Sequence, residues 1–315
     1  MLKFGEKDHK FGEKTLNLQI NMCLMRFFVA ILLLLFVILP IRSATKRALL
    51  IGISEYPVNK TVKDASWQPI HGANDIDVIG KTLKAQDFKI ALLTNKDATA
   101  LKIRKEFNKL LSNASSGDLI YIHFSCHGQP VEDLNGDEQD GWDEAIVPYD
   151  AWKIPIKGVY DGNNHIIDDE LNSVIGKIRK KVGVSGFVYV VIDACHAGGI
   201  DRGEEEEYLR GTKSGFSLSN KNYVPRMDAR SNIPIEHVNG WANVCMLEAC
   251  RAYQSNYEIK QDGTYYGPLS YYVNQVLQQQ SLTRDTKWVE SVKQLMERNP
   301  KLLKQNMVIQ TTLRK

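Results

Sequence analysis

The chain has 315 residues, of which 43% are hydrophobic and 24% are charged, as is ordinary for a globular protein with one large α/β domain or two small ones. The formal charge of +3 comes from residues 1–43, which hold six Lys/Arg and three Asp/Glu. Residues 44–315 hold 34 charges of each sign, so the composition gives no support for a nucleic-acid partner.

The first recognisable element is an apolar run of thirteen residues, 27–39, which follows Arg26. It is too short for a comfortable membrane span and has the length of a signal-peptide core. The small residues Ser43 and Ala44 offer a cleavage point. We therefore expect residues 1–43 to be a signal peptide or an N-terminal anchor. The protein would then be exported, periplasmic or secreted, and meet a membrane only through this segment; the alternative is a buried core helix.

The rest of the chain alternates apolar runs with segments of helical periodicity. In chain order we expect strand 46–54, helix 72–85, strand 88–94, helix 99–111, strand 115–128, helix 168–181, strand 186–199, strand 242–250, helices 267–279 and 286–298, and strand 307–313. Nearly continuous apolar strands between helices are typical of a parallel sheet covered on both faces. The predicted fold is a three-layer α/β/α sandwich with a mostly parallel sheet of about six strands.

Residues 201–240 differ from the rest of the chain. They contain a run of four glutamates, then Gly, Ser, Asn, Lys and Arg, with few apolar residues. Such a segment is predicted to be a mobile linker or exposed loop outside the core. It divides the domain at 44–315 into a large part, 44–200, and a small part, 241–315.

Two predicted strands end in reactive side chains, with the sequences HFSCHG and DACHAGG. Sites in parallel sheets form at the carboxyl ends of strands, so His127 and Cys195 are expected to face each other. The imidazole would take the thiol proton and return one to a leaving amine. Backbone N–H groups at Gly128 and Cys195 are suited to hold an oxyanion.

Other interpretations of these residues remain. A buried cysteine at a strand end is often a packing residue. His123 and His127 suggest a metal cluster, but no closed four-ligand spacing is found. The other cysteines after Cys23, which are Cys126, Cys245 and Cys250, belong to a chain too large for a disulfide scaffold. Neither a Rossmann nor a P-loop glycine motif is present, so nucleotide binding has no support.

The motifs SCHGQ (125–129), DGWDEAIVPYD (140–150) and VIDACHAGG (191–199) stand in this order, after RALLIGISEY and GAND. Over residues 46–280 the chain resembles the caspase-like cysteine peptidases, and most closely the metacaspase branch. The resemblance implies a caspase-like sheet and a cysteine endopeptidase that needs no cofactor for its chemistry. Cys195 would be the nucleophile and His127 the base and acid. Cys126, Ala194 and Ala197 depart from the usual family residues.

The same resemblance implies a pocket for a basic side chain, lined by Asp75, Ser125 and Asp193, and hence cleavage after Arg or Lys. The arginine that a caspase pocket for aspartate needs is not present at these positions. Asp75 has a second explanation, because an acid in the first turn of a helix is favoured by the helix dipole.

Metacaspases often bind calcium through scattered acids, so calcium is a candidate activator. The resemblance matches the four ligands Asp143, Asp168, Asp169 and Asp201. The acidic loop from Asp133 is not an EF-hand, because glutamate stands where that motif has glycine. The alternative is a solvated acidic loop in which Asp168 caps a helix.

The expected partners are peptides or proteins that contain Arg or Lys, and we expect a monomer. Long polar loops concentrate proteolysis, so the 201–240 linker is a predicted region of self-cleavage. The basic residues available there are Arg202, Arg210, Lys213, Lys221, Arg226 and Arg230. The alternatives are a thiol hydrolase of other specificity and a caspase-fold binding protein without turnover, which would usually have lost the cysteine or the histidine.

Overall fold

The computed structural model describes residues 22, 24–26, 44–196, 208–225 and 235–313. The chain divides into two units, residues 1–43 and 44–315. The apolar run 27–39 and the predicted cleavage point at Ser43 lie outside the described residues. Within the described ranges, no helix has the length and apolar character needed to cross a membrane.

The second unit is built on a six-stranded sheet with the order β11-β8-β7-β3-β1-β2. Its strands are β1 (Lys46–Gly52), β2 (Lys89–Thr94), β3 (Leu119–Ser125), β7 (Phe187–Asp193), β8 (Asn243–Glu248) and β11 (Val308–Thr311). All neighbouring strands pair in parallel except β11, which is antiparallel to β8. The mostly parallel sheet predicted from the apolar runs is therefore confirmed.

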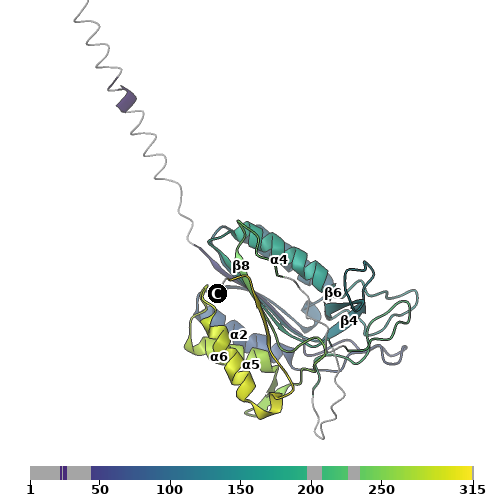
Figure 1. The fold of residues 1–315 in the computed structure, drawn as a ribbon. Coiled ribbons are helices and arrows are strands. Elements are labelled where there is room, and N and C mark those ends of the chain that lie inside the picture. The colour runs from purple at the N-terminus through teal and green to yellow at the C-terminus, as the bar shows by residue number, and fades with distance from the viewer. Residues whose placement is uncertain (1–21, 23, 27–43, 197–207, 226–234, 314–315) are drawn as a thin grey trace, which may run out of the picture. The chain divides into compact units, whose positions relative to one another are not determined.

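Helices cover both faces of this sheet, as Figure 1 shows. The helices α3 (Ala100–Asn113) and α4 (Asp168–Val182) bury Phe107 and Ile175 against one face. On the other face lie α2 (Gly72–Ala85), α5 (Pro268–Gln279) and α6 (Lys287–Arg298), whose apolar sides form a second core. These five helices match the expected ones, and the three-layer α/β/α sandwich is confirmed.

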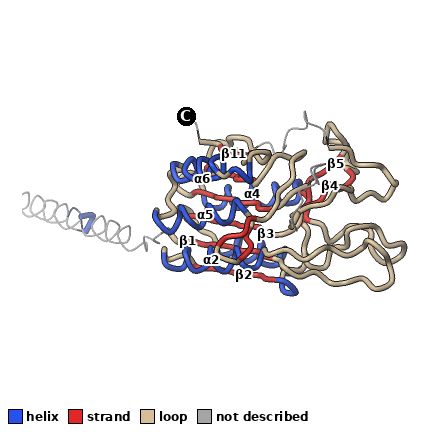
Figure 2. The backbone as a smooth tube through the Cα atoms, turned by 90° about the horizontal axis from the view of Figure 1, so that it is seen from below, coloured by secondary structure: helices blue, strands red, loops and turns tan. Residues whose placement is uncertain are grey.

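Short strands that the sequence pattern did not reveal form two smaller sheets. One consists of β4 (Gly128–Glu132), β5 (Trp142–Ile146) and β6 (Ile166–Ile167), and the other of β9 (Ile259–Gln261) and β10 (Thr264–Tyr266). Figure 2 shows β4 and β5 beyond one end of the central sheet, among its loops. Strands of two to five residues carry too little alternation to stand out in a sequence. The first of these sheets matters because β4 begins directly after His127.

The register of the central strands aligns their carboxyl ends. Ser125 at the end of β3 pairs with Asp193 at the end of β7, and with Gly52 at the end of β1. The residues that follow these strands therefore lie along one edge of the sheet. This edge carries the cysteine and histidine motifs, as the strand-end argument requires.

The expectation that the 201–240 linker lies wholly outside the core is wrong for its described part. Arg210 is fully buried, and Phe216 is buried between Tyr160 and His165. The Phe216 N–H donates to Pro130, so the segment extends the edge of β4. The polar composition predicted that this segment would be exposed. In the structure, Arg210 is instead buried among carboxylates, and Phe216 packs in an aromatic cluster.

Candidate active site

His127 lies two residues after β3, with its imidazole buried. Its Nε2 lies 2.8 Å from the carbonyl oxygen of Gln68, and the ring of Trp67 stacks on it at 4.8 Å between centroids. The carbonyl accepts a proton held on Nε2, so Nδ1 carries the lone pair. Among the described residues, Nδ1 has no hydrogen-bond partner. Burial lowers the pKa of His127 to about 4, so the ring is neutral at pH 7.

Cys195 lies two residues after β7 and is also buried. The backbone N–H groups of Cys195 and Gly128 both donate to the carbonyl oxygen of Arg210, at 3.0 and 3.1 Å. Two N–H groups that converge on one carbonyl oxygen have the geometry of an oxyanion hole. The carbonyl of the Arg210–Gly211 peptide bond is therefore held by the backbone of the two motif residues, while the Cys195 thiol donates to the carbonyl oxygen of Gln254 at 2.9 Å.

The guanidinium of Arg210 is fully enclosed by carboxylates. Its Nη2 lies 2.7 Å from Asp75 and 2.8 Å from Glu258, and its Nη1 lies 3.8 Å from Asp193. The Ser125 hydroxyl accepts from Nη1 at 2.5 Å and donates to Asp75 at 2.6 Å. We call Asp75, Ser125, Asp193 and Glu258 the acidic pocket. Three of them were predicted to line a pocket for a basic side chain, and the structure brings them together.

The charges of the acidic pocket depend on one another. Burial by itself would lower the pKa of Arg210, but the three carboxylates raise it above its usual value, so the guanidinium stays charged. Burial raises the pKa of Asp75, while Arg210 acts in the opposite direction. Asp193 is held by Asn256 and by the backbone N–H of Ser270 in the first turn of α5, each at 2.7 Å. The pocket is thus a set of hydrogen-bonded acids arranged around one cation.

Glu258 was not predicted as a site residue. One of its oxygens accepts from both Nε and Nη2 of Arg210, at 3.1 and 2.8 Å, and the other lies 2.5 Å from Nδ1 of His71. It lies between β8 and β9, past the same edge of the sheet as Asp193. The sequence does carry a signal for this residue, because Glu258 is an acid that follows the apolar run 242–250. Site residues are expected after the carboxyl ends of parallel strands, and this applies to β8 as well as to β3 and β7.

Two glycines leave the space that the segment around Arg210 occupies. A Cβ atom on Gly267 would lie 2.5 Å from Nη1 of Arg210, and one on Gly211 would collide with the carbonyl oxygen of Cys195. A cleft of about 620 Å³ lies beside His127, and Tyr208, Gly211 and Ser214 are among the residues that line it. The segment that carries Arg210 therefore forms part of the wall of this cleft.

A second group of acids lies on the loop between β4 and β5 and at the start of β5. Carboxylate oxygens of Asp133, Asp137 and Asp143 all lie within 4.8 Å of one another, and we call these three residues the acidic loop cluster. Only Asp143 belongs to the predicted calcium ligands. Asp169 accepts a hydrogen bond from Asn135 of the same loop at 2.8 Å. The structure thus gathers three acids, of which the sequence singled out one.

Asp168 lies at the start of α4, beside the acidic loop cluster. Its Oδ1 is buried and has no hydrogen-bond partner within the described ranges. The helix N-cap is Ile167, so the alternative role of Asp168 as a cap is wrong. Burial and neighbouring charges raise the pKa values of Asp143 and Asp168 to about 7 each. The fourth predicted ligand, Asp201, lies outside the described residues.

The fold and the site define a caspase-like protein. The profile of the family described as "Caspase domain" matches residues 45–315, so the chain belongs to this family. It is 30% identical to Metacaspase-7 of Arabidopsis thaliana over 166 residues, which cover 51% of this chain and 37% of that protein. It is 25% identical to Metacaspase-1 of Schizosaccharomyces pombe over 274 residues, which cover 74% of this chain and 60% of that protein. The resemblance to the metacaspase branch is confirmed.

The chain spans only part of each of these relatives, 37% and 60% of their lengths. A solved structure of a protein from Geobacter sulfurreducens matches with a TM-score of 0.57 at 19% identity, over 85% of this chain and 93% of that chain. At that identity the match supports the fold alone.

Proposed function

We propose that the chain is a cysteine endopeptidase that cuts after arginine, and that its first substrate is its own Arg210–Gly211 bond. The observation that carries the proposal is the double engagement of Arg210. Its guanidinium fills the acidic pocket while its carbonyl oxygen accepts from the N–H groups of Gly128 and Cys195. A substrate arginine would make the same contacts.

The residues divide the chemistry between them. The neutral His127 ring takes the Cys195 proton on Nδ1, and the thiolate attacks the arginine carbonyl carbon. The negative oxygen that forms is held by the N–H groups of Gly128 and Cys195. The imidazolium then gives its proton to the leaving amine, the C–N bond breaks, and a thioester remains. Water, activated by His127, hydrolyses the thioester and restores the thiol.

The contacts favour arginine over lysine. Glu258 accepts from Nε and Nη2 together, a pairing that matches the planar guanidinium and that an ammonium cannot reproduce. Lysine would still meet the charge of Asp75 and Asp193, so it should be a slower substrate. Aspartate would be repelled by all three carboxylates.

Calcium fits the acidic loop cluster as an activator outside the chemistry. Asp143 and Asp168 offer buried carboxylates whose pKa values are raised by burial and by neighbouring charge, and Asp168 has an oxygen without a partner in the described part of the chain. These are hard oxygen ligands of the kind calcium prefers. When bound, calcium would neutralise the carboxylates and tie the β4–β5 loop to α4.

The test is hydrolysis of matched fluorogenic peptides that end in Arg, Lys or Asp by the purified chain, with Cys195→Ala and His127→Ala variants. We expect the order Arg, Lys, Asp and loss of roughly a thousandfold or more in either variant. Cys245→Ala, which removes a buried thiol away from the site, is the matched control. Binding of Arg peptides without turnover would instead support the caspase-fold binding protein. Faster cleavage after Asp would refute the pocket assignment.

A further inference from the structure

A second buried thiol accompanies the nucleophile. Cys195 follows β7 and Cys250 follows β8, and these strands are parallel neighbours whose register pairs Ile192 with Glu248. Cys195 is 1% exposed and Cys250 is 5% exposed. Neighbouring strands lie roughly 4.8 Å apart, within the range of Cα separations that a disulfide bridges. Both cysteines are thiols in this structure.

The two thiols point to the same place. Both donate to the carbonyl oxygen of Gln254, at 2.9 Å from Cys195 and 3.5 Å from Cys250. They also form a hydrogen bond with each other; this bond, followed by burial, holds the pKa of Cys250 well above its usual value. While Cys195 is reduced, Cys250 therefore stays protonated at neutral pH and does not compete with Cys195 for substrate. Oxidation of Cys195 removes this thiol–thiol hydrogen bond, the first cause of the raised pKa, so the Cys250 sulfur becomes more reactive.

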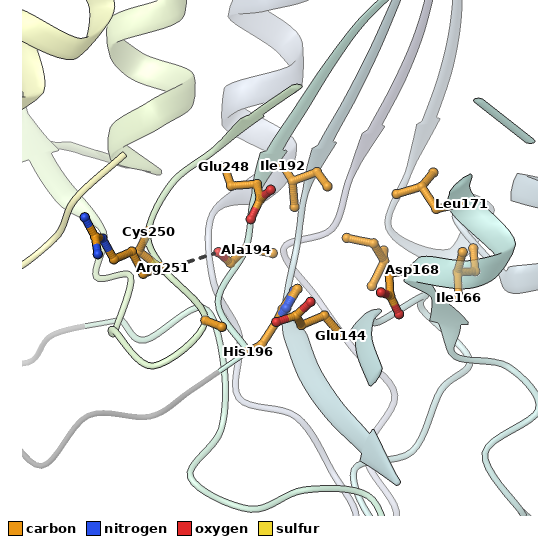
Figure 3. Close-up of a pocket in the computed structure, with 12 residues that line it drawn as sticks. Glu144, Ile166, Asp168, Leu171, Ile192, Ala194, His196, Glu248, Cys250 and Arg251 are labelled. Atoms are coloured by element: carbon orange, nitrogen blue, oxygen red, sulfur yellow. Dashed lines mark hydrogen bonds between the residues drawn. The ribbon is translucent and has the colours of Figure 1, made fainter. Parts of the chain in front are cut away.

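A small cavity lies against Cys250, the second of the two thiols. Its volume is about 30 Å³, and it is lined by Ala194, His196, Cys250 and Asp168, among others. Figure 3 shows Cys250 and Ala194 along one side of it and Asp168 and Leu171 along the other. A space of this size holds a water molecule. The wall of the cavity is mostly apolar and includes Ile146, Ile192 and Ala194.

We propose that Cys195 and Cys250 form a reversible redox pair, in which Cys250 resolves the oxidised nucleophile. Hydrogen peroxide oxidises the Cys195 thiol to a sulfenic acid and releases one water. The Cys250 sulfur then attacks the sulfenic sulfur, and a second water leaves as the disulfide forms. The two thiols together supply the two electrons that reduce the peroxide. A dithiol reductant restores both thiols by exchange.

The pair has two consequences for the enzyme. The disulfide removes the nucleophile, so hydrolysis stops while the pair is oxidised. It also diverts the sulfenic acid from further, irreversible oxidation to the sulfinic acid. If the chain is cut after Arg210, the disulfide joins the two fragments, since Cys195 and Cys250 lie on opposite sides of that bond. This last consequence rests on the proposed self-cleavage; the disulfide itself does not.

The experiment treats the purified full chain with hydrogen peroxide, quenches with catalase, and compares wild type, Cys250→Ala and the control Cys245→Ala. Non-reducing peptide mapping by mass spectrometry should find the Cys195 and Cys250 peptides linked in wild type and in the control. Dimedone, which traps sulfenic acids, should label Cys195 strongly only in Cys250→Ala. Activity on an Arg peptide, normalised to each untreated variant, should return after dithiothreitol roughly tenfold better in wild type than in Cys250→Ala.

Peptide mapping and dimedone labelling do not depend on turnover. They therefore show whether Cys195 and Cys250 form a disulfide even if the chain proves to have no peptidase activity. Wild type that carries dimedone on Cys195 and shows no linked peptides would overturn the proposal. The proposal would also be overturned if wild type and Cys250→Ala recovered the same fraction of activity after dithiothreitol, at a peroxide dose that forms sulfinic acid in Cys250→Ala. If Cys250→Ala does not fold, the linked peptides of wild type alone still decide.

Discussion

Two clusters of carboxylates lie at the same end of this molecule and differ in what balances their charge. The acidic pocket surrounds Arg210, and Asp75 and Glu258 each lie within 2.8 Å of its guanidinium. Across the described residues, no ion pair engages Asp143 or Asp168 near the acidic loop cluster, and burial with mutual repulsion raises their pKa values to about 7. Burial raises the pKa of Asp75 to about 7 as well, but there Arg210 acts in the opposite direction, whereas no ion pair within the described ranges does so for Asp143 or Asp168.

The difference separates specificity from regulation. A pocket that is filled by an arginine of the same chain is complementary in shape and charge to an arginine substrate. Arg210 must leave this pocket before another substrate binds. Buried carboxylates such as those of Asp143 and Asp168, which have no ion pair among the residues that the structure describes, change their charge with pH and with divalent ions. The predictions below disturb one cluster at a time.

The largest effect is expected from removing the internal cation. In a Cys195→Ala background, which keeps the chain uncut, Arg210→Ala leaves three buried carboxylates without their partner. The free energy of unfolding should fall by about 3–5 kcal/mol, as for other broken buried ion pairs. Urea denaturation measures it, with Lys213→Ala, an exposed cation of the same segment, as the control. A loss below about 1 kcal/mol would mean that the pocket does not depend on Arg210.

The next largest effect is expected from a change at the Arg210–Gly211 bond rather than in the acidic pocket. Gly211→Val should slow self-cleavage roughly a hundredfold, about 3 kcal/mol, because a side chain there collides with the Cys195 carbonyl. Time courses of chain cleavage by gel electrophoresis measure the rate. Lys213→Val places the same bulk two residues further on, where the side chain is exposed, and should be cut normally. Unchanged cleavage of Gly211→Val would point to another bond.

Selectivity within the acidic pocket should change less. Glu258→Gln removes the charge that pairs with both Nε and Nη2 of Arg210. The ratio of kcat/KM for Arg over Lys peptides should fall roughly tenfold, about 1.4 kcal/mol. Asp77→Asn, an exposed acid of α2, serves as the control. An Arg/Lys ratio that does not move would assign the selectivity to Asp75 and Asp193.

The smallest effect concerns the acidic loop cluster. Burial and the charge of Asp143 raise the folded-state pKa of Asp168 to about 7. The stability from its protonated form is fully present below the unfolded-state pKa of about 4 and is lost as pH rises toward 7. Between pH 6 and 7.5 without calcium, wild type should lose about 1 kcal/mol more than Asp168→Asn. Equal losses in urea titrations would contradict the buried ionisation, and excess calcium should offset the loss in wild type.

The sequence was sufficient for the central sheet and for most of the candidate site. Long apolar strands and amphipathic helices are strong patterns, and the family motifs place Asp75, Ser125 and Asp193 together although they are far apart in the chain. Arg210 was predicted only as one basic residue of an exposed linker. Its burial depends on contacts with Asp75 and Glu258, far away along the chain, which local composition does not record.

The acidic loop cluster shows the same limit. Asp143 was identified by resemblance, but Asp133 and Asp137 join it only because the turn between β4 and β5 folds back on itself. The β4–β5 hairpin was itself too short to predict. The thiol pair was missed for a related reason, since the alignment of Cys195 with Cys250 depends on the order of β7 and β8 in the sheet.

The most direct test of the account is N-terminal sequencing of the purified chain after incubation, together with its intact mass. The account predicts one new N-terminus at Gly211, with the chain cut after Arg210, and a Cys195→Ala variant that stays whole under the same conditions. A new N-terminus at another residue, or the same cut in Cys195→Ala, would contradict the claim that Arg210 lies in its own active site as substrate.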